Sequence, residues 1–116
     1  MDNQPTYEID SDGTKKWVLN GKFHRIDGPA IEYTDGSYVW YLNDKRHRVD
    51  GPAMEYPSSH KKWYINGVLH RVGGPAVEYP DGTKKWYLNG VNFSFEDFLE
   101  KIEDEELKLE IVLKYG

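Results

Sequence analysis

A 23-residue period runs through most of this 116-residue chain and constrains its fold more than any other feature. The four tryptophans keep this spacing, at Trp17, Trp40, Trp63 and Trp86. The same spacing repeats a His-Arg pair, a Gly-Pro-Ala triplet and a Glu-Tyr pair, which begin at His24, His47 and His70, at Gly28, Gly51 and Gly74, and at Glu32, Glu55 and Glu78. A repeat of this length predicts one supersecondary unit that buries its faces against its neighbours.

Each unit contains two short strand-like runs separated by turn residues. Lys84–Leu88 alternates with period two and ends at Asn89-Gly90, a pair suited to positive φ in a tight turn. The second run, 76–79, leads into a Pro-Asp-Gly turn signal. The sequence therefore predicts a mainly β fold, an elongated antiparallel meander of 23-residue β-hairpin repeats, with a longer connection through each His-Arg segment.

Period two also predicts which side chains share a face. Each tryptophan shares one face with the aliphatic residue two positions later, namely Leu19, Leu42, Ile65 and Leu88. Val18, Tyr41, Tyr64 and Tyr87 lie on the other face. We assign the Trp face to the core and the Tyr face to a half-exposed surface, because a phenol can reach water.

This unit, with an aromatic-x-x-Asn-Gly turn, a histidine-containing connection and a Tyr-x-Asp-Gly closure, resembles the MORN repeat over residues 6–92. It is most similar to the divergent variant of bacterial and phage proteins, some of which are antitoxins. The core His24–Ala30, found again at 47–53 and 70–76, departs from the glycine-rich MORN pattern, which argues against the lipid binding ascribed to some MORN proteins. The resemblance implies a sheet of hairpins used as an interaction surface, and no enzyme.

The period changes after residue 93. Phe95, Phe98, Leu99 and Ile102 fall at i, i+3, i+4 and i+7, which predicts an amphipathic helix with Ser94 as its N-cap. The acidic run 103–106 interrupts this pattern and predicts a second short helix or a kinked continuation. We therefore divide the chain into repeats (1–93) and an acidic helical cap (94–116) that covers the end of the sheet. The alternative is that the acidic face of this segment mimics nucleic acid or docks on a basic partner.

The composition of the chain excludes several classes of function. The chain has no cysteine, which excludes disulfides, thiolate catalysis and Cys-based zinc sites. Residues 94–116 hold eight acids against three lysines and so carry the whole net charge of −5. A neutral body with an acidic end argues against general nucleic-acid binding and against an anionic membrane surface. The chain shows neither a signal-like start nor an apolar span, so we expect a cytoplasmic protein of a bacterial cell or a phage-infected host.

No catalytic or metal site emerges from the residue pattern. Equivalent histidines in successive hairpins are two strands apart, about 10 Å, whereas the ligands of one zinc ion lie about 2 Å from it. No nucleophile elbow or phosphate loop is present, so we expect no enzyme, no metal and no cofactor. We expect Arg25, Arg48 and Arg71 to hold the connections by pairing with Glu32, Glu55 and Glu78. The alternative is an arginine ladder that binds a small ligand.

The second and third units differ from the rest, and these differences predict a binding patch. Tyr38-Val39 replaces Lys-Lys, a basic run follows Asn43-Asp44, and the third Asp-Gly turn is replaced by 58–60. Aromatic and apolar residues beside arginine and histidine are typical of a protein-binding hot spot. The predicted partner-facing residues are Tyr38, Val39, Tyr41, Arg46, His60 and Tyr64. Simple drift in a tolerant repeat is the alternative explanation of these differences.

Together, these features predict a non-enzymatic protein–protein interaction module. The family resemblance further implies that this module is an inhibitor or antitoxin-like protein, which binds its target and occludes it. The alternative function is a protein that sequesters a small ligand such as a nucleotide signal, through the arginine ladder. Open sheet edges also make a homodimer possible.

Overall fold

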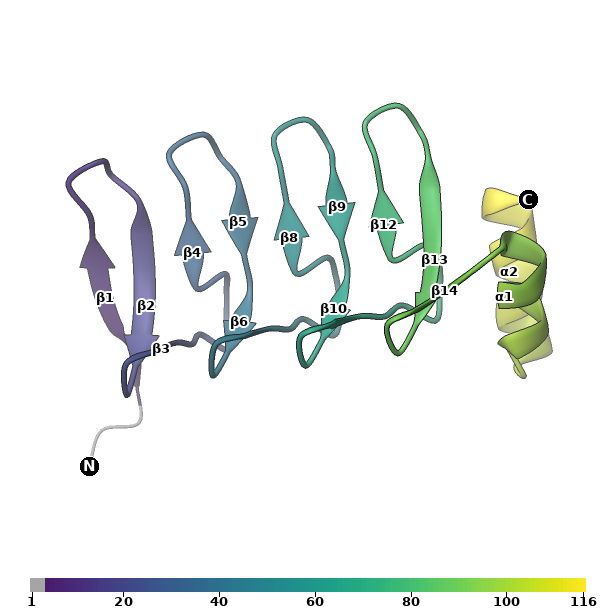
Figure 1. The fold of residues 1–116 in the computed structure, drawn as a ribbon, viewed down its shortest axis with the longest axis horizontal. Coiled ribbons are helices and arrows are strands. Elements are labelled where there is room, and N and C mark those ends of the chain that lie inside the picture. The colour runs from purple at the N-terminus through teal and green to yellow at the C-terminus, as the bar shows by residue number, and fades with distance from the viewer. Residues whose placement is uncertain (1–3) are drawn as a thin grey trace.

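A computed structural model describes residues 4–116 as a row of antiparallel hairpins with two helices at one end (Figure 1). The principal axes measure 45 × 33 × 21 Å. One ten-stranded sheet runs in the order β1-β2-β4-β5-β8-β9-β12-β13-β14, with β3 paired to β2, and β6–β7 and β10–β11 form two small separate pairs. Since sheet neighbours follow chain order, the predicted mainly β meander with a C-terminal helical cap is confirmed.

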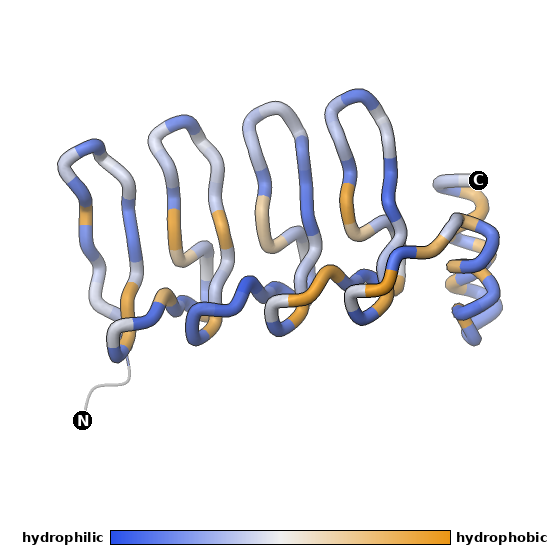
Figure 2. Tube along the Cα trace, in the orientation of Figure 1, coloured by the Kyte–Doolittle hydropathy of each residue, from blue (hydrophilic) through white to orange (hydrophobic). Residues whose placement is uncertain are grey.

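Most strands are short, and in the two middle units the strand is interrupted at Trp40 and at Trp63. Their bounds are β1 Thr6–Ile9, β2 Lys15–Leu19, β3 Lys22–Phe23, β4 Ile31–Glu32, β5 Tyr38–Val39, β6 Tyr41–Leu42, β7 Lys45–Arg46, β8 Met54–Glu55, β9 Lys61–Lys62, β10 Tyr64–Ile65, β11 Val68–Leu69, β12 Val77–Glu78, β13 Lys84–Leu88 and β14 Val91–Phe93. Figure 2 shows hydrophobic segments at similar heights in successive hairpins, as a repeat of constant register requires.

One end of the first, second and fourth hairpins is closed by an Asp-Gly turn. The Asp35 carboxylate accepts from the Ser37 backbone N–H at 2.8 Å, and Gly36 adopts φ +93°. The third unit lacks the glycine, and Ser59 takes its place at φ +74°. This conformation is rare for a residue with a Cβ, so the third turn keeps its shape at some cost in backbone energy.

The other end is closed by a two-residue turn with positive φ at both positions, as in type I′ hairpins. Asn66 and Gly67 have φ of +48° and +84°. In the second unit Asp44 replaces the glycine at φ +66°, and its carboxylate accepts from the Phe23 backbone N–H of the preceding unit at 2.7 Å. The aspartate thus gains a bond between units that a glycine cannot make.

Each histidine of the His-Arg segment joins its unit to the next one. The Nδ1 atom of His47 accepts a hydrogen bond from the Asn66 backbone N–H at 2.9 Å. His24 and His70 accept in the same way from Asn43 and Asn89, at 3.1 and 2.9 Å. Each of these histidines therefore acts as a clip between successive repeats.

The burial of the Trp and Tyr side chains on the two faces of the sheet differs from the prediction. Among the tryptophans only Trp86 is buried, whereas Trp17, Trp40 and Trp63 are half-buried. On the Tyr face, Tyr64 is only 8% exposed. The assignment of the whole Trp face to the core is therefore wrong. A single-layer sheet has no inner face of its own, and a tryptophan becomes buried only where another element covers it.

The helical cap supplies that cover at Trp86. Helix α1 (Phe95–Lys101) begins at Ser94, whose hydroxyl accepts from the Asp97 N–H, and α2 (Glu105–Tyr115) begins at Asp104. Trp86, Phe98, Ile102 and Ile111 form the buried cluster, and the Phe95, Phe98 and Tyr115 rings lie 4.8, 4.9 and 5.4 Å from the Trp86 ring. The predicted helix, its N-cap and the second helix are confirmed.

Candidate functional site

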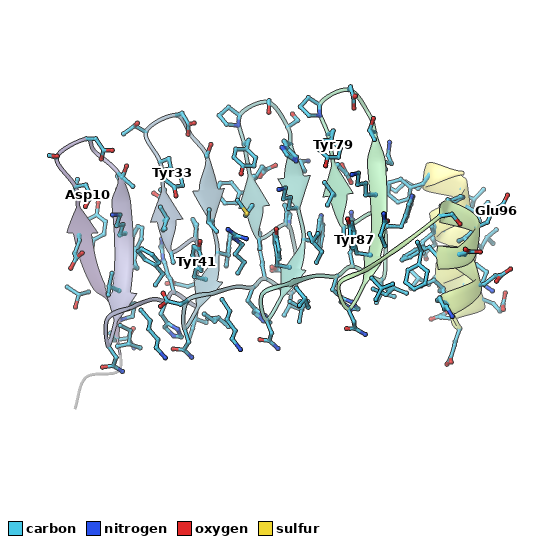
Figure 3. All side chains as sticks on the ribbon, in the orientation of Figure 1. Asp10, Tyr33, Tyr41, Tyr79, Tyr87 and Glu96 are labelled. Atoms are coloured by element: carbon cyan, nitrogen blue, oxygen red, sulfur yellow. The ribbon has the colours of Figure 1, made fainter. Side chains whose placement is uncertain are left out.

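The predicted binding residues fall mainly around one hollow of the second and third hairpins. Tyr38, Val39, Tyr41 and Arg46 line this hollow, which has a volume of about 270 Å³. Its remaining lining residues come from the neighbouring strands and turns: Tyr33, Asp35, Ser37, Met54 and Tyr56. We call this site the tyrosine hollow. Figure 3 labels two of its lining residues, Tyr33 and Tyr41.

Strand pairing explains why these residues meet. Val39 pairs with Ile31 of β4 on one side and with Met54 of β8 on the other. Strand β5 therefore holds β4 and β8 on either side of it. Val39 is itself buried and forms the base of the hollow. Tyr33 and Tyr56 are the tyrosines of the repeated Glu-Tyr pair, one unit apart. Sequence reasoning missed them and Met54, although the period combined with antiparallel pairing could have found them.

The polar groups of the hollow are held by their neighbours. The Tyr38 hydroxyl donates a hydrogen bond to the Glu55 carboxylate. Burial, and then this hydrogen bond, raise the pKa of the Tyr38 phenol. A phenol with a raised pKa stays protonated at neutral pH, so the Tyr38 side chain is uncharged.

Arg46 provides the positive charge beside these rings. Its guanidinium carbon lies 5.3 Å from the centre of the Tyr64 ring, within the range of a cation–π contact. Burial lowers the pKa of Arg46, but the Tyr41 and Tyr64 hydroxyls outweigh burial and raise the pKa overall. Tyr64 is therefore placed as a buried support beneath Arg46, and its side chain offers little surface to a partner.

His60 lies next to the hollow and does not line it. Its ring stacks between Tyr56 and Tyr79, with centroid distances of 5.1 and 4.7 Å. The Nε2 atom is buried and has no hydrogen-bond partner among the described residues. His60 thus contacts the hollow only through Tyr56.

The position of His60 predicts a pH effect on stability. Burial, and secondarily the charge of Lys62, lower the pKa of His60 below its ordinary value of about 6.5. Protonation then favours the unfolded chain, so stability falls as pH drops through about 6.5. We expect urea unfolding at pH 7.5 and 5.5 to show a larger loss for the natural chain than for His60→Phe, which keeps the ring stack. Equal losses in the two proteins would contradict this assignment, since the other three histidines are common to both.

The arginine ladder is occupied by contacts within the chain. Arg25, Arg48 and Arg71 place their guanidinium carbons 3.9, 4.1 and 3.7 Å from the centres of the Trp17, Trp40 and Trp63 rings. Each also donates through Nη1 to the carbonyl of the proline four residues later, at 3.1–3.2 Å. These contacts fit a structural role for the ladder.

The expected arginine–glutamate pairs form in two units of the three. Arg71 lies 3.3 Å from Glu78 and Arg25 lies 3.7 Å from Glu32. In the middle unit, Arg48 pairs with Asp50 at 3.1 Å, while Glu55 accepts from Tyr38 and pairs with Lys61. The Tyr38 hydroxyl thus contacts the glutamate whose equivalents pair with arginine in the other two units.

Within residues 4–116 no group of three or more metal-ligating side chains comes together. In the same range, no helix combines the length and the apolar character that crossing a membrane requires. No protein-family model matches the chain, and neither a curated protein nor a solved structure does.

Proposed function

We propose that this chain is a non-enzymatic protein-binding module that docks a partner protein on the tyrosine hollow. The observation that carries the proposal is the meeting of Tyr38, Tyr41 and Arg46 with Tyr33, Met54 and Tyr56 around one concave site. Tyrosine, arginine and methionine are the residues most enriched at the centres of protein interfaces.

Departure from the repeat supports the same proposal. At position 38 the other units have Lys15, Lys61 and Lys84, and at position 39 they also have lysine. Lysine satisfies the fold at these places, so folding does not demand the aromatic and aliphatic pair of the second unit. Two lysines at positions 38 and 39 would be strongly hydrated, whereas Tyr38 and its neighbours can be desolvated by a partner.

The resemblance to MORN-like repeats, with antitoxins among their bacterial and phage members, favours an inhibitor that occludes its target in the cytoplasm. A rigid row of hairpins suits this mode, because a pre-formed surface loses little conformational entropy on binding. The arginine contacts within the chain weigh against the alternative of a sequestered nucleotide signal.

The test uses a variant that restores the repeat. Tyr38→Lys with Val39→Lys gives the second unit the residues of its neighbours, so we expect it to fold. Tagged natural chain and variant are recovered from host lysate and compared by non-denaturing mass spectrometry, with Val91→Lys, an exposed residue on β14, as control.

We expect a stoichiometric partner on the natural chain and on the control, and its loss from the double variant. A partner that the double variant retains would overturn the hollow as the docking site. A bound small molecule without a protein would favour sequestration instead.

A further inference from the structure

A row of five side chains crosses the sheet close to the hairpin turns. Tyr33, Tyr56 and Tyr79 directly follow β4, β8 and β12, and Ser37 and His60 directly precede β5 and β9. Since the sheet runs in the order β4-β5-β8-β9-β12, tyrosines alternate with the other two residues along this row. Figure 3 labels Tyr33 and Tyr79, the first and last tyrosines of the row.

Strand register makes these residues direct neighbours. The register of β4, β5 and β8, continued by one residue toward the turns, places Ser37 between Tyr33 and Tyr56. That of β8, β9 and β12 places His60 between Tyr56 and Tyr79 in the same way. The Tyr33 N–H donates to the Ser37 carbonyl at 2.8 Å, and the Tyr56 N–H donates to the His60 carbonyl at 3.0 Å. The backbone therefore presents Ser37 and His60 alike, each between two tyrosines on one face.

In the second interval of the row a ring fills the space. His60 stacks on Tyr56 and on Tyr79, with centroid distances of 5.1 and 4.7 Å and interplanar angles of 27° and 29°. Side chains two strands apart are separated by about 10 Å, so one ring between them meets both at about 5 Å. Aromatic pairs prefer centroid distances of about 4.5–7 Å. The interval between two tyrosines of this row thus fits one flat ring.

The first interval has the same tyrosine walls, but a serine stands where the third unit has histidine. Ser37 is exactly one 23-residue period before His60, and its side chain has no ring to stack. Tyr33, Ser37 and Tyr56 all line the tyrosine hollow. Tyr33 is 44% exposed, so its side chain offers surface that a partner can cover. The hollow thus includes the place of a missing ring, and we call this space between Tyr33 and Tyr56 the ring slot.

We propose that the ring slot receives an aromatic side chain of the partner protein, which stacks between Tyr33 and Tyr56 as His60 stacks between Tyr56 and Tyr79. This inference rests on the function proposed above and adds the type of side chain with which the partner enters the hollow. A ring makes two stacking contacts there, whereas an aliphatic side chain makes none.

The other lining residues of the hollow favour an uncharged protein side chain over a nucleotide base. Asp35 and Arg46 both line the hollow, so its charged groups are of opposite sign and give a phosphate no net attraction. Met54 lines it as well, and a thioether makes favourable contacts with aromatic rings. The hollow therefore combines stacking walls with a soft apolar neighbour.

The first test titrates the protein with N-acetyl-tyrosinamide, and with N-acetyl-leucinamide as the non-aromatic control. Binding is followed by NMR of protein with labelled tyrosine rings, in which a Tyr33→Phe variant identifies the Tyr33 signals. We expect the tyrosine compound to bind about tenfold more tightly than the leucine compound and to shift the signals of Tyr33 and Tyr56. Equal binding of the two compounds, or shifts confined to other tyrosines, would overturn the proposal. Tighter binding of adenosine than of the tyrosine compound would overturn the assignment to a protein side chain.

Two histidine variants locate the slot. Ser37→His gives the second unit the ring of the third, so we expect it to fill the slot and to weaken the tyrosine compound at least about tenfold. Thr83→His is the matched control, because this exposed position of the fourth unit has a tyrosine of the row on one side only. We expect the control to keep the affinity of the natural chain, and equal affinities of the two variants would contradict the slot.

The converse variant is His60→Ser, which removes the ring from the second interval. We expect it to create a second slot, so that the tyrosine compound also shifts the signals of Tyr79. This result does not depend on whether Ser37→His folds. Unchanged Tyr79 signals would mean that a pair of tyrosines at this spacing does not take up a ring.

The same variants separate this inference from the proposed function. In the lysate experiment, Ser37→His should lose the partner and Thr83→His should keep it. A partner that is lost from the Tyr38→Lys, Val39→Lys double variant but kept by Ser37→His would leave the hollow as the docking site and overturn the slot. If the natural chain captures no partner, the proposed function fails, and the titrations alone decide whether the slot takes an aromatic side chain.

Discussion

Replacing Phe98 by alanine should cost about 3–5 kcal/mol of the free energy of unfolding, the range found for aromatic deletions in cores. Phe98 is fully buried at the centre of the cap, with its ring 4.9 Å from that of Trp86. Its loss leaves a cavity beneath both helices, since Ile102 and Ile111 pack in the same cluster. Urea unfolding followed by circular dichroism measures the change.

Leu113→Ala is the matched control for this prediction, because Leu113 lies on the same pair of helices with its side chain in solvent. It should change stability by less than about 0.5 kcal/mol. A loss below about 1 kcal/mol for Phe98→Ala would mean that the cap does not unfold together with the repeats.

Replacing Gly51 by alanine should cost about 1 kcal/mol, because the new methyl group displaces the packed guanidinium of Arg48. A Cβ on Gly51 would lie 2.6 Å from the Cζ atom of Arg48. The guanidinium would have to leave its place over Trp40 and give up its hydrogen bonds to Asp50 and to the Pro52 carbonyl. The glycine is thus required by a packed side chain, since its φ is not in the left-handed region.

Two comparisons isolate this cause. At Gly73 a Cβ would meet no atom within 4 Å, so Gly73→Ala should be neutral or stabilising by up to about 1 kcal/mol. In an Arg48→Ala background, Gly51→Ala should lose most of its cost, because the atom it displaces is gone. Thermal and urea unfolding of the four proteins of this cycle give the coupling. An equal cost with and without Arg48 would refute the packing explanation.

Periodicity was sufficient to predict the hairpins, their order and the helical cap. The Asn-Gly and Asp-Gly turns are local features, and strand order follows when each unit can pair only with its neighbours. The cap could be predicted equally well, because the N-cap Ser94 and the apolar spacing of α1 are signals that lie within a few residues of the sequence.

The burial of side chains and the hydrogen-bond partners of polar groups were harder to predict from the sequence. Trp86 and Trp63 occupy the same place in their units, and only the helices packed over Trp86 make their burial differ. Likewise, the partner of His47 is a backbone amide of the next unit, which depends on how the units stack. Four predicted binding residues line one hollow because they share a unit, whereas His60 stacks on a ring of the following unit.

The histidine clips have a consequence for how such a protein folds. Each clip joins residues only 19 apart in the sequence, and the strands of adjacent hairpins pair across 17 residues, as Tyr38 does with Glu55. An all-β protein usually folds slowly because distant segments must find one another. Here no strand has to wait for a remote partner, so the sheet can assemble in sequence order, each finished hairpin serving as the template for the one that follows.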